Sequence, residues 1–504
     1  MKGARLLDSA KKVINFKVLL FALFFVILFL FFSHRLTKVP PGINIDESSF
    51  GYNASLLAKN LRDENNRFLP VFILTLDGKD WKPPIRMYLT AITFRLFGRS
   101  YLNFRMVSVF VAVASCFLFF LLLKLFFSTK LSLVGLFVFA SSPSLLLQSH
   151  LGSDNIDILP WIILWLFFFA LYCKKFKPTY LLLSGIFLGI SFYTYKAMHA
   201  IVPVYLGISM VYFFLLNFWR KTGKKFDFLW FLLGIAPFLL PLKWLQVHYA
   251  GAIFDPAIMN RPSFYNSVYI YLSSFDFSFI FLKGDKMLMH STGRHGIFLL
   301  PCLPLFFLGF LQLYKEKKPL YYFIFASLIL TPLLFTMVGS VYRASRLLAY
   351  IPTASFIFTL GIKFIHEIKN KTIEKALLLF FFLLLSLNYG DFVRYYWYDY
   401  PKLISGDFSP NLDRAMAELK KLTLETGKNP YFEKSTYVSH KADIQFFKEV
   451  YFPYQEVKIW TREKESFPGQ SFVLSNISGS GEIINYRAIP SLESGQRTMY
   501  ILGK

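Results

Sequence analysis

Residues 18–32 read VLLFALFFVILFLFF, a run without a single polar side chain. A run of this kind near an N-terminus is either a transmembrane helix or a signal peptide. Ser33-His34-Arg35 follows it instead of a small-residue cleavage site, and Met1–Lys17 carries five bases and one acid. The stretch therefore predicts an uncleaved first transmembrane helix with a cytoplasmic N-terminus.

The composition of the whole chain also indicates a membrane environment. Of the 504 residues, 55% are apolar and 19% aromatic, and the mean hydropathy is +0.46. A water-soluble protein of this length could not bury so much apolar surface, whereas lipid can solvate it. Further apolar runs lie near 104–127, 131–148, 157–173, 180–195, 200–219, 228–247, 296–314, 320–339, 347–365 and 376–390. We therefore expect an all-α polytopic membrane domain at 1–390 with about eleven transmembrane helices.

The formal net charge of +25 comes from bases whose positions indicate membrane topology rather than a nucleic-acid-binding surface. Residues 391–504 contain 15 Lys+Arg and 14 Asp+Glu, so the excess of bases lies in short loops between the apolar runs. Alternating the runs puts these basic loops on the N-terminal, cytoplasmic side. The segments expected outside are 33–103, 149–156, the turn at 195–199, 248–295, 340–346 and the tail.

The predicted cytoplasmic loops are too short to hold a nucleotide-binding domain, and none contains a Gly-rich phosphate cradle. Any chemistry must then use the external face or the membrane. The tail, 391–504, predicts a small extracytoplasmic α/β domain that acts as a lid, a docking surface or plain structure. It has a helical pattern at Leu412–Leu422 and strand-like runs at Thr436–Ser439, Val457–Thr461, Ser471–Leu474, Ile483–Tyr486 and Met499–Leu502.

Acidic side chains are scarce between Trp81 and Phe226, where only Asp154 and Asp157 occur. Both fall at the predicted outer end of a helix pair. Ionisable groups at membrane depth are costly and often mark functional sites. The alternative is an exposed acid that caps the next helix. We expect a functional role for Asp154 and a capping role for Asp157.

Asp46 and Glu47 form a second acidic site, in the first external segment. Neighbouring carboxylates near an apolar boundary can hold different pKa values, which leaves one available as a general base. The alternative is again a helix N-cap, because Ser48–Asn60 has the pattern of an amphipathic helix lying along the membrane.

Basic side chains gather at the same predicted boundary. A single cation there commonly snorkels, but a ring of cations opposite two carboxylate sites indicates an anionic ligand such as a phosphate. For His290 the alternatives are a surface histidine or a metal ligand. The group comprises Lys196 next to Tyr195, Arg343, Arg346, and the histidines His34, His150, His199, His248, His290 and His295.

The residues around these acids resemble a known family. Pro41–Glu47 (PGINIDE), Gly51–Ala54 (GYNA) and Trp81–Pro84 (WKPP) are similar to the first external loop of bacterial membrane glycosyltransferases of the GT-C fold. These are relatives of the protein O-mannosyltransferases and the lipid A aminoarabinose transferases (glycosyltransferase family 39-like). The likeness continues in order over roughly 17–390, through SFYTY at 191–195, Gly284-Asp285, HSTGRHG at 290–296, and Arg346 with Ile351-Pro352.

The resemblance implies a hexosyl- or pentosyltransferase of the bacterial inner membrane. Such enzymes take a sugar from a polyprenyl-phosphate donor and place it on a lipid, glycan or protein acceptor outside the cytoplasm. By the resemblance, Asp46 is the general base, Glu47 supports or orients it, and Asp154 is a second acid. Residues implied for the phosphate or sugar are Arg346, which would stabilise the departing phosphate, and Lys82, Tyr195, Lys196 and His290.

The chain also departs from the family pattern. His150 stands where many relatives have Arg, and Asp154 stands where many bacterial members have Glu, so the donor sugar is left open. Use of a divalent metal varies across such enzymes and is left open as well.

Two other functions share some of these features. A transporter or lipid flippase would have a similar helix count and basic cleft, but it should show internal repeats and charges in the middle of its spans. The chain shows no clear repeat, and its ionisable residues gather at one boundary. A catalytically inert scaffold whose tail binds a partner is the third interpretation.

Overall fold

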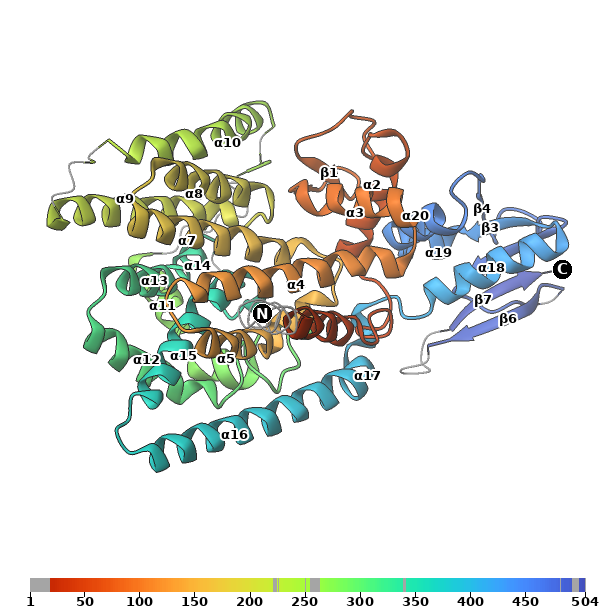
Figure 1. Cartoon of the computed structure of the whole chain (residues 1–504). Helices are drawn as coiled ribbons and strands as arrows, with labels where there is room; N and C mark the ends of the chain where they lie inside the picture. The colour runs from red at the N-terminus through yellow and green to blue at the C-terminus, as the bar shows by residue number, and fades with distance from the viewer. Residues whose placement is uncertain are drawn as a thin grey trace, which may run out of the picture.

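The computed structural model describes residues 19–220, 224, 226–249, 251–253, 263–338, 341–480, 482–491 and 498–503. Helices make up most of the chain, and a five-stranded sheet lies at one end (Figure 1). Several sequence predictions fall outside the described residues. They concern the basic segment Met1–Lys17, Lys221 and Lys225 in one basic loop, and parts of the segments 248–295 and 340–346.

Each predicted apolar run contains a helix. Within the residues that the structure describes, six helices are long and apolar enough to cross a membrane. A seventh results if the pair α5 (Thr129–Ala140) and α6 (Pro143–Ser149), bent by 63°, counts as one span. The six are Tyr101–Lys124 (α4), Asp154–Lys175 (η1 and α7), Met198–Phe218 (in α9), Phe228–His248 (α10), Pro319–Met337 (in α13, Pro319–Leu330, and α14, Leu333–Val338) and Lys371–Tyr398 (α16).

The remaining runs form shorter helices. These are Leu19–Ser33, α8 (Pro178–Ile190), α12 (Cys302–Glu316) and α15 (Tyr350–His366). The protein is an integral multi-pass membrane protein, but the count of about eleven spans stays a prediction. The connecting elements are η2 (Ser191–Tyr193), α11 (Phe264–Ser273), η3 (Ser278–Lys283), η4 (Leu288–His290) and η5 (Ala344–Arg346).

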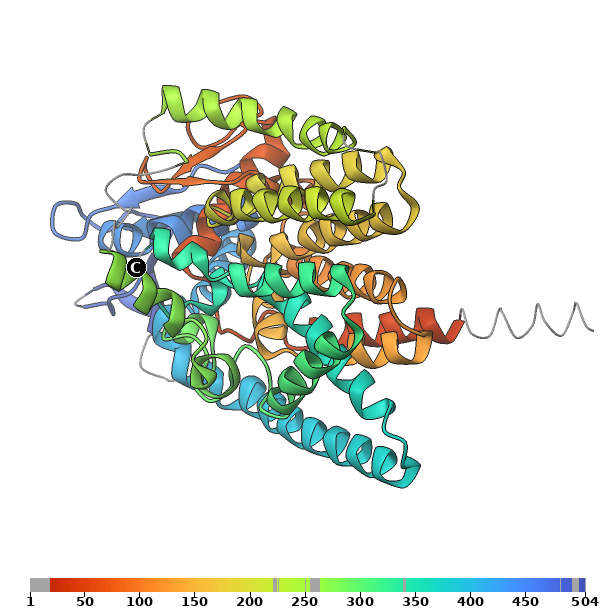
Figure 2. The ribbon, with the colours of Figure 1, turned by 90° about the vertical axis from the view of Figure 1, so that its left-hand side faces the viewer.

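The two ends of the helical layer differ. Figure 2 shows the sheet domain at the left. The start of helix Leu19–Ser33 and the turn from α15 to α16 lie at the right. Lys369 lies in that turn, and Lys371 begins α16. This arrangement agrees with the alternation predicted from the basic loops, while the orientation in the membrane stays a prediction.

The segment 33–103, which the sequence predicts to be the first external segment, folds on the sheet side as a helix, a hairpin and a second helix. Helix α2 (Ile45–Asn60) starts three residues before the predicted Ser48 because Asn44 and Glu47 form a capping box. Strands β1 (Ile73–Thr75) and β2 (Asp80–Lys82) pair antiparallel, with Thr75 opposite Asp80. Helix α3 (Ile85–Phe97) follows and packs on α2.

A buried ion pair ties α3 to the start of α7 (Ile158–Lys175) and corrects one sequence prediction. Arg86 donates from Nε and Nη2 to the two oxygens of Asp157, at 3.0 and 2.6 Å, and neither residue is more than 1% exposed. The side chain of Asp157 makes no capping hydrogen bond. The predicted exposed cap is therefore wrong, because the carboxylate neutralises an arginine that would otherwise be buried alone.

The tail is the expected small α/β domain. Its mixed sheet has the order β4-β3-β5-β7-β6, with β3 parallel to β4 and β5 and the other neighbours antiparallel. The strands are β3 (Asn429–Glu433), β4 (Lys458–Trp460), β5 (Ser471–Ser475), β6 (Ile484–Pro490) and β7 (Thr498–Gly503). The helices are α17 (Tyr400–Ile404), η6 (Ser405–Asp407), α18 (Leu412–Thr426), α19 (Lys434–Ser439) and α20 (Lys441–Tyr451).

Four of the five predicted strands and the helix after Asn411 are confirmed. The strand predicted at Thr436–Ser439 is wrong, because these residues belong to α19, and sequence reasoning missed β3 and α20. Helix α16 continues through the boundary predicted at 390/391 and ends at Tyr398.

Candidate active site

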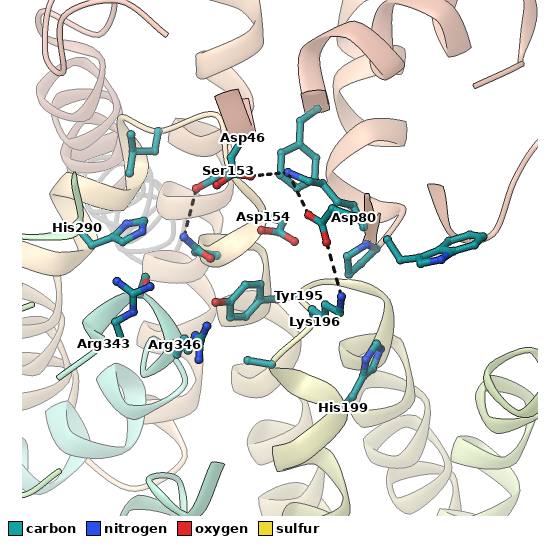
Figure 3. Close-up of a pocket in the computed structure, with 18 of the residues that line it drawn as sticks. Asp46, Asp80, Ser153, Asp154, Tyr195, Lys196, His199, His290, Arg343 and Arg346 are labelled. Atoms are coloured by element: carbon teal, nitrogen blue, oxygen red, sulfur yellow. Dashed lines mark hydrogen bonds and ion pairs between the residues drawn. The ribbon is translucent and has the colours of Figure 1, made fainter. Parts of the chain in front are cut away.

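A cavity of about 360 Å³ lies where the segment 33–103 meets the other loops of the sheet-side end. Its lining comes from the start of α2, the β1–β2 hairpin, η1 (Asp154–Asp157), the turn before α9 (Met198–Arg220), η4 and η5. All of the residues proposed from the sequence line it except Glu47: they are Asp46, Lys82, Asp154, Tyr195, Lys196, His290 and Arg346. Asp46, Asp154 and Arg346, which are far apart in the chain, therefore share one cavity (Figure 3).

Asp46 lies in the first turn of α2 and faces the cavity. Its Oδ1 accepts a hydrogen bond from Lys82 Nζ at 2.8 Å, and its side chain is 56% exposed while that of Lys82 is 6% exposed. Desolvation raises the pKa of the Asp46 carboxyl, but the charge and hydrogen bond of Lys82 lower it below its ordinary value. Asp46 is thus an ionised carboxylate at neutral pH, with room for a ligand beside it.

Glu47, the next residue, turns away from the cavity and is fully buried. Arg105 of α4 donates to it from Nε and Nη2, both at 3.0 Å, and the amide of Gly152 donates at 2.6 Å. Glu47 thereby fastens the start of α2 to α4 and to the loop before η1. The structure places this residue under the site rather than in its wall.

Asp154 enters the cavity from η1. It is 7% exposed, and Figure 3 shows it between Asp46 and Tyr195. The loop that carries it is fixed on both sides, because Gly152 binds Glu47 and Asp157 binds Arg86. The two acidic sites predicted separately from the sequence therefore face each other across a short gap.

Two arginines and a histidine form the opposite wall. Figure 3 shows Arg343, Arg346 and His290 together, facing the side on which Asp46 and Asp154 lie. Tyr195 stands between the two groups and shares a hydrogen bond with Arg346. Burial raises the pKa of the Tyr195 phenol, although Arg346 opposes this, so the phenol stays protonated and can donate a hydrogen bond.

Hydrogen bonds determine the tautomer of His290. Asn155 Nδ2 donates to Gln148 Oε1 at 3.3 Å, which leaves Gln148 Nε2 to donate to His290 Nδ1 at 3.1 Å. The proton of the neutral ring is then on Nε2. Burial and the nearby Arg343 lower the pKa of His290 to about 4, so at neutral pH the ring is an uncharged donor.

Asp285 supports the cationic wall from behind. Its Oδ1 accepts from the amide of Met287 at 2.8 Å, its Oδ2 accepts from the amide of Ser345 at 3.5 Å, and its charge faces Arg343. This carboxylate therefore joins the loop that carries His290 to the loop that carries both arginines. Asp285 belongs to the Gly284-Asp285 motif, but nothing in the sequence indicated this role.

Sequence reasoning missed Asp80, a third acid in the lining. One of its oxygens lies 3.7 Å from Lys82 Nζ and the other 3.6 Å from Lys196 Nζ. The signal that could have found it is the position of Asp80 two residues before Lys82 in a short strand, where both side chains point to one face. Arg343, named among the outer cations but not selected, also lines the cavity.

The cavity thus has an acidic side and a cationic side. Its lining holds three acidic side chains (Asp46, Asp80, Asp154) and four bases (Lys82, Lys196, Arg343, Arg346), and burial raises the pKa of Asp154 to about 8. Such a site can accept a proton at one wall and stabilise a phosphate at the other. Within the described part of the chain, no group of three or more His, Cys, Asp or Glu side chains is arranged to hold a metal ion.

Comparison with solved structures identifies the architecture. ArnT from Cupriavidus metallidurans in the apo state superposes with a TM-score of 0.58 over 97% of this chain and 98% of that one, at 10% sequence identity. The same protein bound to undecaprenyl phosphate gives a TM-score of 0.56 over 96% and 97%, also at 10% identity. The chain has the GT-C glycosyltransferase fold.

Sequence comparison supports the same group over part of the chain. Residues 81–244 match the family described as dolichyl-phosphate-mannose-protein mannosyltransferase. A search of curated protein sequences found no match. The GT-C resemblance drawn from the ordered motifs is therefore confirmed, whereas the roles that it implies for the site residues stay predictions.

Proposed function

We propose that the protein transfers a sugar from a polyprenyl-phosphate donor to an acceptor hydroxyl at the extracytoplasmic face of the membrane. The observation that carries the proposal is the single cavity in which ionised Asp46 faces Arg343 and Arg346 at the sheet-side end of the helices. The description of the matched family names a lipid-phosphate sugar, and one ArnT structure contains bound undecaprenyl phosphate. Both agree with a lipid-borne donor that enters sideways from the bilayer.

Asp46 acts as the general base in a single in-line displacement. The transition state at the anomeric carbon resembles an oxocarbenium ion, so the acceptor hydroxyl becomes strongly acidic only as the new C–O bond forms. A carboxylate with a lowered pKa can accept a proton at that stage, and it is ionised beforehand. One displacement without a covalent intermediate inverts the anomeric configuration.

The leaving lipid phosphate gains charge as the bond to the sugar breaks. We assign Arg346 to stabilise it, assisted by Arg343, by the Tyr195 hydroxyl and by Nε2–H of His290. These donors are preorganised by Asp285 and Gln148, so little reorganisation is needed during the reaction.

The remaining candidates lie on the acidic side. Lys82 holds Asp46 ionised, and Lys196 and Lys82 both approach Asp80, a position suited to sugar hydroxyls as well as to phosphate. We assign Asp154 to hold a sugar hydroxyl beside Asp46. Glu47 is a positioning residue that keeps α2 against the loop of Asp154.

A transporter or flippase is not favoured. Its mechanism requires charged groups along a path through the membrane, whereas the charges described above are concentrated around one cavity near the sheet domain. We also propose that the sheet domain lies outside the cytoplasmic membrane of a bacterium and the basic loops inside, in accordance with the positive-inside pattern.

Purified protein incubated with a panel of polyprenyl-phosphate hexoses and pentoses tests the proposal. Mass spectrometry should detect released polyprenyl phosphate together with sugar on water or on an added lipid, glycan or peptide acceptor. Asp46→Asn serves as the matched inactive variant. Absence of turnover with every donor, under conditions in which the protein stays folded, would contradict the proposed function.

A further inference from the structure

Helix α20 of the sheet domain packs directly on α2, the helix that begins beside Asp46 (Figure 1). The two elements share one apolar core, in which Phe50 and Leu57 of α2 lie in the same cluster as Phe446 and Phe447 of α20. The approach is close, since a Cβ on Gly51 would lie 2.6 Å from the ring of Phe446. The sheet domain is therefore built into the first external segment rather than appended to it.

Buried hydrogen bonds reinforce this contact on both sides of Asp46. Asp443 of α20 accepts from Ser48 Oγ at 2.5 Å and from Ser409 Oγ at 2.6 Å. The amide of Ser409 donates to the carbonyl of Ile43 at 2.8 Å. Ser48, Ser409 and Asp443 are each at most 7% exposed. The chain three residues before Asp46 and two residues after it is thus fastened to the sheet domain.

The same helix also holds the β1–β2 hairpin. Lys441 Nζ lies 2.8 Å from both carboxylate oxygens of Asp77 in the hairpin turn, with the two side chains 41% and 60% exposed. Asp80 and Lys82 follow in β2. One helix of the tail therefore contacts both segments that supply the Asp46–Lys82 pair.

We propose that α20 positions the acidic side of the catalytic cavity, with Asp443 and Lys441 as the positioning residues. This inference rests on the proposed function and gives the sheet domain a role in the chemical step. The cavity is lined by residues between Asn44 and Arg346, so α20 acts through α2 and the hairpin, not by contact with substrate. The cationic wall has separate supports, among them Asp285.

The two walls should consequently respond differently to substitution. Asp443→Ala removes both buried hydroxyl contacts and is expected to lower kcat by about 10- to 100-fold, because an ångström of misplacement at a reacting group can cost that much. The KM for the donor should stay within about twofold, since the phosphate-binding wall is unchanged. Ser48→Ala, which removes one hydroxyl only, should lower kcat less, and the double variant should fall no further than Asp443→Ala alone.

The exposed ion pair between Lys441 and Asp77 can be tested by exchanging its two charges. Lys441→Glu should lower kcat by about two- to fivefold, in the range of a surface ion pair, and adding Asp77→Lys should restore it. Arg487→Glu is the matched control, because Arg487 of β6 pairs with Glu418 of α18, two elements of the sheet domain that lie away from α2 (Figure 1). That control should keep the wild-type kcat.

Hydrogen exchange tests the positioning without reference to activity. In Asp443→Ala and in Ser48→Ala, amides of 45–60 and 73–82 should exchange faster than in the wild type, whereas those of 343–346 should not change. Unchanged exchange in both variants, or a kcat equal to wild type with both variants folded, would overturn the inference. A wild-type protein without sugar transfer would instead refute the proposed function, and the exchange result would still decide the positioning.

Discussion

Replacing Asp46 by Asn separates catalysis from stability, because this side chain is ionised and yet more than half exposed. Asn keeps the oxygen that accepts the hydrogen bond of Lys82 but cannot take up a proton from the acceptor. A positioned general base contributes about 10²–10⁴ in rate, so kcat should fall by that factor, or about 3–5 kcal/mol in barrier height. Lys82 is nearly buried but keeps the carboxylate of Asp80 at 3.7 Å, so the lost charge pair should lower the free energy of unfolding by only about 1–2 kcal/mol.

The assay measures initial rates of sugar transfer at saturating donor, together with the Tm of the purified variant. Asp399→Asn is the matched control, since Asp399 is also an exposed acid paired with a base, Arg394, but lies at the end of α16. It should transfer sugar at the wild-type rate. Turnover by Asp46→Asn within about fivefold of the wild type would refute the assignment of the base, and so would a loss of activity that merely follows a collapse of Tm.

Three further predictions concern the surrounding residues. Glu47→Gln leaves Arg105 buried without its charge partner and should lower the free energy of unfolding by about 3–5 kcal/mol, seen as a large fall in Tm. Arg346→Lys keeps a charge but loses the planar fork, so it should lower kcat and leave the Tm within about 2 °C, whereas equal transfer rates would contradict its role at the phosphate. His290 is neutral in the folded protein above pH 4, while the unfolded chain takes up a proton below pH 6.5. Wild-type Tm should therefore fall between pH 6.5 and pH 4, and His290→Gln should show a smaller fall.

The sequence best predicted the features that depend on the order of apolar runs and loops along the chain. Residues at the outer ends of successive helices must lie in one layer, so the alternation of apolar runs and basic loops brought Asp46, Asp154 and Arg346 to the same side of the membrane. Their convergence on one cavity depends on how the helices pack, and it is seen in the structure.

Partners that lie far apart in the chain could not be predicted. Asp157 has the pattern of a capping residue, and nothing near it in sequence reveals that Arg86 lies against it. The strand prediction at Thr436–Ser439 relied on β-branched and aromatic residues, but strand propensity depends on context. There Tyr437 stacks on Phe432 of β3 at a centroid distance of 6.4 Å, and the segment forms a short helix over the sheet.

Asp46 and Glu47 show why a pair of adjacent acids can serve two purposes. Successive residues of an α-helix point about 100° apart, so when one carboxylate faces the cavity, its neighbour must point elsewhere. Here Glu47 points into the protein, where Arg105 and the amide of Gly152 bind it. The buried neighbour fixes the rotation of the first turn of α2, and that rotation aims Asp46 at the cavity. The exposure of the base and the burial of its support are therefore two results of one helical turn, which explains why the chain places both acids directly after the cap at Asn44.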